Sequence, residues 1–174
     1  MKKILLLGYI ISLSSLFSVE TKFAVSGSYY NELMLKPGVS LCSEVEVALN
    51  DKNSLILGIP TINYFYYPGS SQSISIFPEV TYLYRSSKSF FIGLSIGSGV
   101  SIKEYIVPVY DRYGNISNKN KEYQSISLAG IVFGFDNFYE GEFEASLGWK
   151  GLYPYNLGFQ HQPYFQVGYR RYIK

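Results

Sequence analysis

From residue 21 onward the chain alternates apolar and polar residues with a period of two, and amphipathic helix periodicity is scarce. Successive side chains of a β-strand point to opposite faces, so this alternation is typical of strands with one apolar and one polar face. The pattern predicts eight strands, at residues 21–30, 39–50, 54–64, 72–85, 89–103, 122–135, 138–150 and 163–173.

The segment 72–85 shows the alternation most clearly. Its apolar face carries Ile74, Ile76, Val80, Tyr82 and Tyr84, and its polar face carries Ser73, Ser75, Glu79 and Thr81. In 54–64 both faces are apolar and Pro60 interrupts the run, which predicts a bulge or an edge position. In 122–135 the two faces are less distinct near Ile131 and Phe133.

The connections between these strands alternate in length. Short connections at 51–53, 86–88 and 136–137 are separated by longer ones at about 31–38, 65–71, 104–121 and 151–162. An even number of antiparallel strands with short turns at one end and long loops at the other describes a transmembrane β-barrel. We therefore expect an all-β fold, an eight-stranded antiparallel up-and-down barrel. A soluble barrel, with its apolar face inside, is the alternative architecture.

The distribution of aromatic residues favours the membrane form. Aromatic residues make up 18% of the chain, and 18 residues are tyrosine, whose apolar ring and polar hydroxyl suit a membrane interface. Tyr139 and Trp149 share one face of a strand, ten residues apart. That spacing is roughly 33 Å of extended chain, or about 25 Å of height in a tilted strand, which is the height of a lipid-facing band.

If lipid covers the apolar faces, the charged residues of the polar faces point into the lumen. An eight-stranded barrel is narrow enough for side chains to fill it, and buried charges there need partners. We expect a structural network of lumen ion pairs, with Arg170 binding Glu142 or Glu140 and with Lys150 near Glu144. By strand phase its members are Glu44, Glu46, Glu79, Lys103, Glu140, Glu142, Glu144, Lys150 and Arg170.

The first residues have the pattern of a secretory signal. Lys2 and Lys3 precede an apolar run from Ile4 to Ile11, and small residues follow up to Ser18. We expect residues 1–18 to be a cleaved signal peptide and 19–174 to be the barrel domain; an uncleaved anchor helix is the alternative. Without Lys2 and Lys3 the 15 basic residues become 13, equal to the 13 acidic ones, so no nucleic-acid partner is expected.

On these features the chain resembles the small eight-stranded outer-membrane barrels, the group that contains the OmpA transmembrane domain, OmpX and NspA. Its end is similar to the assembly signal of that group at Gln166, Gly168 and Ile173, and it departs from the signal at Arg171 and Lys174. The resemblance implies secretion to the periplasm and residence in the outer membrane. It also implies loops outside the cell and both termini in the periplasm.

The residues offer little catalytic chemistry. His161 is the only histidine, and we expect it in a loop at the mouth of the last strand. Lipid A deacylases of this shape have a serine two residues after their histidine, where this chain has Pro163. A single histidine and a single cysteine, Cys42, leave no transition-metal cluster, and no cofactor is implied.

The function expected is therefore that of a monomeric outer-membrane surface protein, not an enzyme, in contact with outer-membrane lipids. Its role would be structural, or adhesion through loops that bind an extracellular protein or host ligand. Candidate loop contacts are Tyr105, Tyr110, Arg112, Tyr113, Tyr153 and Tyr155. The alternatives are that these aromatics rest in the headgroup layer, and that the barrel modifies lipid A or passes small hydrophobic solutes.

Overall fold

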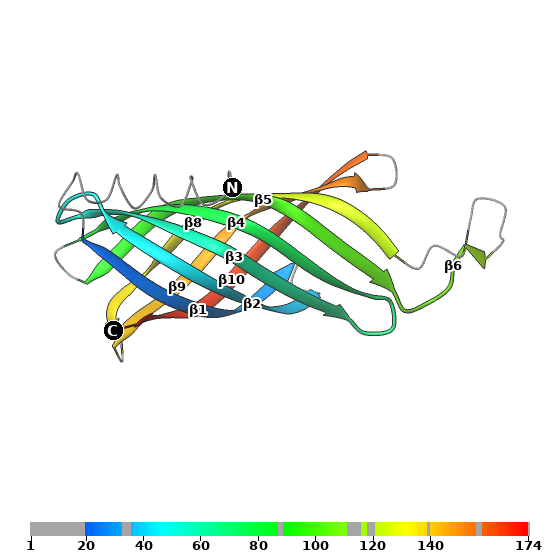
Figure 1. Cartoon of the computed structure of the whole chain (residues 1–174). Helices are drawn as coiled ribbons and strands as arrows, with labels where there is room; N and C mark the ends of the chain where they lie inside the picture. Colours follow the sequence, from blue (N-terminus) through cyan, green and yellow to red (C-terminus); the bar gives the residue numbers. More distant parts are fainter. Residues whose placement is uncertain are drawn as a thin grey trace, which may run out of the picture.

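The computed structural model describes residues 20–32, 36–86, 89–110, 116–117, 121–138, 140–155 and 158–173. Eight long antiparallel strands close into one barrel in the order β1-β10-β9-β8-β5-β4-β3-β2 (Figure 1). Each strand pairs with its neighbour along the chain, and β1 pairs with β10 to close the ring. The predicted eight-stranded up-and-down barrel is confirmed. In the described part of the chain no helix is long and apolar enough to cross a membrane.

All eight predicted strands are present, and each is longer than the alternation indicated. Their bounds are β1 Thr21–Glu32, β2 Lys36–Ala48, β3 Asn53–Tyr67, β4 Ser71–Arg85, β5 Phe90–Tyr105, β8 Lys121–Phe138, β9 Gly141–Tyr155 and β10 Gly158–Ile173. The terminal end of the barrel, as we name it, carries Thr21, Ile173 and the turns that follow β2, β4 and β8. The opposite end is called the projecting end.

The expectation of four long loops at the projecting end was wrong for three of them. Strand pairing continues to Glu32↔Lys36 and Tyr67↔Ser71, and β9 and β10 pair as far as Tyr155↔Gly158. Only the β5–β8 connection is long, and it contains a separate two-stranded sheet of β6 (Val109–Tyr110) and β7 (Ile116–Ser117) beyond the barrel (Figure 1). A hairpin outside the bilayer can be polar on both faces, so hydrophobic alternation does not reveal it.

The irregularity predicted at Pro60 is present as a register shift. The β2–β3 pairing shifts between Cys42 and Glu44, and the β3–β4 pairing shifts between Gly58 and Thr61. Proline has no backbone N–H to donate to a ladder, which favours a bulge where it interrupts a paired strand.

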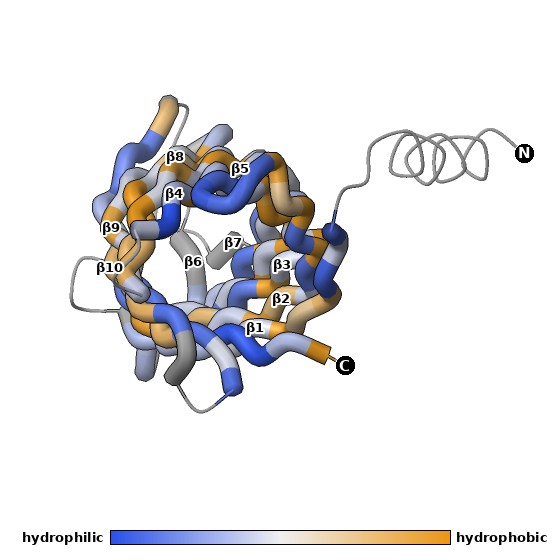
Figure 2. Tube along the Cα trace, turned by 90° about the vertical axis from the view of Figure 1, so that its left-hand side faces the viewer, coloured by the Kyte–Doolittle hydropathy of each residue, from blue (hydrophilic) through white to orange (hydrophobic). Residues whose placement is uncertain are grey.

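The barrel wall separates an apolar exterior from a mixed interior. Hydrophobic and hydrophilic positions alternate along the strands (Figure 2). On β5, Leu94 and Ile96 are more than half exposed outside, whereas Ser95 and Ser101 are buried inside. The lumen also holds large apolar side chains, which explains why the two faces of 54–64 and 122–135 looked alike. They form two clusters, one of Tyr30, Phe65, Phe77, Ile126, Leu128, Leu152 and Tyr164, the other of Ile56, Leu83, Phe91 and Val132.

Candidate functional site

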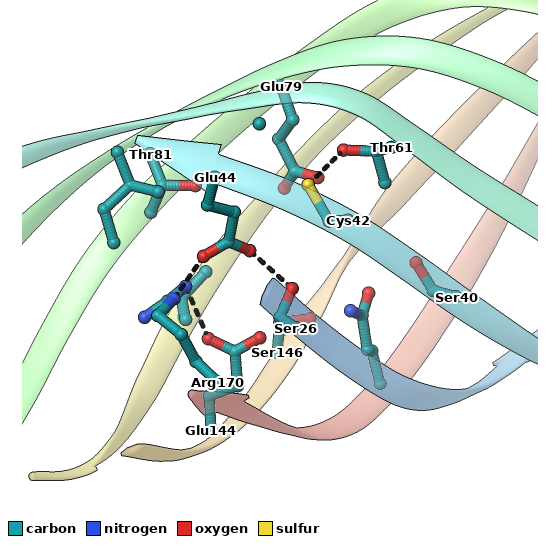
Figure 3. A pocket seen from close by; sticks show the side chains of 14 residues that line it. Ser26, Ser40, Cys42, Glu44, Thr61, Glu79, Thr81, Glu144, Ser146 and Arg170 are labelled. Carbon is teal, nitrogen blue, oxygen red and sulfur yellow. Dashed lines mark hydrogen bonds and ion pairs between the residues drawn. The ribbon is translucent and has the colours of Figure 1, made fainter. Parts of the chain in front are cut away.

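The lumen near the terminal end is organised around Arg170 of β10. Its side chain is 4% exposed and contacts three carboxylates from two other strands. Figure 3 shows two of them, Glu44 and Glu144. Arg170 Nε donates to Glu44 of β2, Nη1 lies 2.6 Å from Glu142 Oε2, and Nη2 lies 2.7 Å from Glu144 Oε2. The last contact is an ion pair whose angles are not those of a hydrogen bond, since that oxygen has no hydrogen-bond partner. One guanidinium thus uses all three nitrogens on carboxylates.

Arg85, at the end of β4, forms the second centre of the same network. Its Nη1 lies 2.7 Å from Glu46 Oε1 and its Nη2 lies 2.6 Å from Glu142 Oε1. Asp136 lies at its edge, with Oδ1 3.6 Å from Arg85 Nε. Glu142 therefore bridges the two arginines. The sequence reasoning missed Arg85, although it has the same strand phase as Glu79 and so faces the lumen.

Hydroxyl groups supply the remaining hydrogen bonds to these carboxylates. Ser26 Oγ donates to Glu44 Oε1 at 2.5 Å. The Tyr172 hydroxyl lies 2.5 Å from Glu46 Oε2 and 2.6 Å from Glu142 Oε1, and it can donate its one hydrogen to either. The acidic side chains outnumber the two arginines, so these neutral donors are part of what makes the cluster tolerable in a narrow lumen.

Several predicted lumen residues are placed as expected. Glu44, Glu46, Glu142, Glu144, Lys150 and Arg170 are buried inside the barrel. Glu79 lines a small polar cavity of about 30 Å³ together with Glu44, Glu144 and Arg170, beside the Cys42–Thr61 hydrogen bond of 3.0 Å (Figure 3). The pairing of Arg170 with Glu142 is the one predicted.

One predicted placement and one predicted pairing are wrong. Glu140 does not face the lumen: it occupies the turn before β9 with a φ of 64°, is 68% exposed, and lies 3.5 Å from Arg171. The predicted pairing of Lys150 with Glu144 is wrong, because Glu144 pairs with Arg170 instead. The Nζ atom of Lys150 lies 4.4 Å from the centre of the Phe65 ring, nearer the projecting end.

The lumen towards the projecting end has a different composition. A second hollow of about 30 Å³ is lined by Lys103 and Lys150, by Gln124, Gln160 and Gln162, and by serines of β4 and β5. The Nζ atom of Lys103 lies 4.5 Å from the centre of the Tyr105 ring. Lys103 thus faces the lumen as predicted, but it belongs to this separate group and not to the arginine network.

Aromatic rings close the lumen between the two polar regions. Tyr30 and Tyr164 stack with ring centres 5.1 Å apart, and Phe65 meets Tyr30 edge-on at 4.8 Å. Tyr164 lies against Gly148, where an added Cβ would come within 2.7 Å of its ring and 2.3 Å of a backbone oxygen. The absence of a side chain at Gly148 therefore lets the ring cross the lumen.

The candidate loop residues divide into four groups. Tyr105 ends β5 and donates to Glu122 Oε2 at 2.8 Å. Tyr153 is not in a loop: it lies in β9 on the outer wall, 53% exposed. Tyr110 and Tyr155 lie in β6 and at the end of β9, and Arg112 and Tyr113 lie outside the described residues, as does the expected signal peptide at 1–18.

His161 also differs from its expected place. It lies within β10 on the outer wall, exposed, with its ring 4.7 Å from that of Phe159. No group of three or more metal-ligating side chains occurs within the described ranges.

The exterior has the pattern of a lipid-facing surface. Near the terminal end, four outward aromatic residues are successive cross-strand neighbours: Phe90, Phe135, Phe143 and Tyr169. Tyr29, Tyr64 and Tyr123 are exposed towards the projecting end, with Leu94, Ile96 and other aliphatic residues between the two levels. Aromatic levels that flank an aliphatic band, outside a lumen that holds the buried charges, are those of outer-membrane barrels. The membrane form of the fold is confirmed over the soluble alternative.

Comparisons with known proteins find structural similarity at low sequence identity. No protein-family model and no curated protein matches the chain. Among solved structures, the N-terminal β-barrel domain of Pseudomonas aeruginosa OprF is 14% identical, with 87% of this chain and 99% of that chain covered and a TM-score of 0.42. Neisserial surface protein A is 12% identical (90% and 98% covered, TM-score 0.44), as is Ail, the attachment invasion locus protein of Yersinia pestis (87% and 97% covered, TM-score 0.44). At these identities the likeness is one of fold: the chain is similar in architecture to small outer-membrane β-barrels.

Proposed function

We propose that the protein is an outer-membrane surface barrel whose solid body anchors and presents the β5–β8 connection to an extracellular partner. The observation that carries this proposal is the shape of that connection. It is the one long connection of the barrel, and it extends past the projecting end as its own β6–β7 sheet (Figure 1). A filled barrel with one projecting connection suits the binding of a partner better than the passage of a solute.

The base of the connection supports a protein-binding role. Ile106 and Val107 are 50% and 43% exposed, directly after the last residue of β5. The backbone N–H of Ile106 donates to Ser70 O at 2.9 Å, which holds this point against the β3–β4 turn. Tyr66 and Tyr67, at the end of β3, are also exposed. Exposed apolar and aromatic side chains on a rigid support are typical of protein interfaces.

The filled lumen argues against transport. A solute that entered from the projecting end would meet the stacked rings of Tyr30 and Tyr164, and beyond them the ion pairs of Arg170. Opening that path would break buried charge pairs, at a cost of several kcal/mol each. We accordingly assign the barrel a scaffold role without catalysis, as a monomer surrounded by outer-membrane lipid.

The test uses cells that display the full chain. In one variant, residues 108–119 are replaced by an Asn-Gly turn; in a second, Ile106→Asp and Val107→Asp are combined. Both should lower adhesion to immobilised extracellular-matrix proteins and heparin, while the matched change Leu49→Asp, exposed at the terminal end, should not. Heat-modifiable migration on gels verifies that each barrel is folded. Unchanged adhesion of the loop variants, or no adhesion by the original protein, would overturn the binding role.

A further inference from the structure

The outer wall of the barrel contains a groove across β5, β8, β9 and β10. Its volume is about 570 Å³, and its rim is formed by Leu94, Ile96, Ile131, Leu147 and Trp149. The groove exists because the cross-strand row Ile96, Ala129, Trp149, Pro163 places two short side chains beside two large ones. Its lining contains no charged residue. An elongated apolar ligand would fit this surface, and a charged one would not.

The end of this groove nearer the projecting end meets a polar row. One step along the strands, the outward residues are Ser98, Ser127, Gly151 and His161, again successive cross-strand neighbours. Ser98, Ser127 and His161 are exposed. Serine hydroxyls and an imidazole on a lipid-facing wall provide hydrogen-bonding groups where the bilayer core provides none. The opposite end of the groove, at Leu94 and Ile131, remains apolar.

An aromatic ring lies within the polar row, over Gly151. The Phe159 ring lies over Gly151, where an added Cβ would be 2.6 Å from the ring and 2.8 Å from Ser127 Oγ. Phe159 also packs against His161 at 4.7 Å and stacks with Tyr153 at 6.3 Å between ring centres. Phe159 therefore separates Ser127 from His161 on the outer surface and packs against both His161 and Tyr153.

We propose that this surface binds one outer-leaflet lipid, with an acyl chain in the groove and the ester and hydroxyl groups of its head region on Ser98, Ser127 and His161. A groove without charge that ends in a polar row at one side only matches an amphipathic ligand, in one orientation. The surface is continuous with the apolar band that lipid already covers. The inference rests on the proposed outer-membrane location, with the projecting end outside.

Trp149 is the only tryptophan of the chain and forms one wall of the groove, so its fluorescence reports what lies there. The full chain is reconstituted in phosphatidylcholine vesicles that contain phosphatidylcholine with brominated acyl chains, which quench tryptophan on contact. Unbrominated lipid A is then added. We expect Trp149 fluorescence to recover several-fold more than the dilution of bromine accounts for. Recovery that only follows dilution would overturn the proposal.

Three variants separate the parts of the site. Ala129→Phe fills the groove and should reduce the recovery to the level of dilution. Leu41→Phe, on the exposed outer wall of β2, adds a similar ring elsewhere and should behave as the original protein. In the double variant Ser127→Ala and His161→Ala, brominated acyl chains should still quench Trp149. Its recovery on adding lipid A should then only follow dilution. An unchanged preference would refute the head-region contacts.

Failure of the lipid site and failure of the proposed location give different results. If the chain is heat-modifiable and floats with vesicles, but its fluorescence recovery only follows dilution, the lipid site is refuted and the membrane location stands. A chain that does not insert into vesicles at all contradicts the membrane location itself.

Discussion

Replacing Arg170 with methionine should destabilise the barrel strongly, because it removes the cation shared by Glu44, Glu142 and Glu144. Breaking a buried ion pair by removing one partner costs about 3–5 kcal/mol. Glu142 keeps Arg85 at 2.6 Å and Glu44 keeps the Ser26 hydroxyl, so the lower part of that range applies. We expect a loss of about 3 kcal/mol in the free energy of unfolding.

The change can be read from urea unfolding in lipid vesicles, followed by Trp149 fluorescence and by heat-modifiable migration. With a urea dependence of about 2 kcal/mol per molar, a loss of about 3 kcal/mol moves the midpoint down by roughly 1.5 M. Acidification should recover part of the loss, because a protonated carboxyl group no longer carries the stranded charge.

Two further variants isolate the cause. Arg170→Met combined with Glu44→Gln and Glu144→Gln removes the stranded charges and should recover stability to within about 1 kcal/mol of the original protein. Arg171→Met, at the adjacent position, removes only a 3.5 Å pair with Glu140 in which both side chains are more than two-thirds exposed, and should cost less than about 0.5 kcal/mol. An Arg170→Met barrel with an unchanged urea midpoint, while all three glutamates remain, would refute the reasoning.

The remaining predictions concern the closed lumen. Gly148→Ala should cost about 1–3 kcal/mol in urea unfolding, because its Cβ would overlap the Tyr164 ring and a backbone oxygen, whereas Gly27→Ala, whose Cβ would meet Leu41 at 3.5 Å, should cost under about 1 kcal/mol. Equal midpoints for the two alanine variants would contradict this packing. In planar bilayers the original protein should give no sustained conductance, and the double change Tyr30→Ala and Tyr164→Ala should raise conductance measurably; a sustained open channel in the original protein would contradict the plug.

The strands and the faces of their residues could be predicted from the sequence, because both follow from local rules. Hydrophobic alternation located all eight strands, and strand phase placed Glu44, Glu46 and Glu142 in the lumen. Strand phase gave a wrong placement where it was applied to a residue outside a strand. Glu140 has the same parity as Glu142, but a turn with a φ of 64° turns it out of the wall.

Which charges meet across the lumen could not be predicted in the same way. Glu144 and Lys150 are six residues apart on one strand, about 20 Å along the chain, so a shared face does not bring them together. Arg170 lies opposite Glu142 in the β9–β10 register, a neighbour relation that chain order already suggests. Its contact with Glu44 of β2 depends instead on ring closure through β1.

Ring closure also explains how only two arginine side chains can form ion pairs with several carboxylates. In an open sheet, each inward carboxylate of β2, β4 and β9 would need its own partner on an adjacent strand. In the narrow barrel, side chains from strands that are not neighbours converge, and Arg85 of β4 reaches both Glu46 of β2 and Glu142 of β9. The Tyr172 hydroxyl, between the same two carboxylates, contributes a donor without charge. The network is therefore a product of the closed ring, which is why removing its central arginine tests the barrel as a whole.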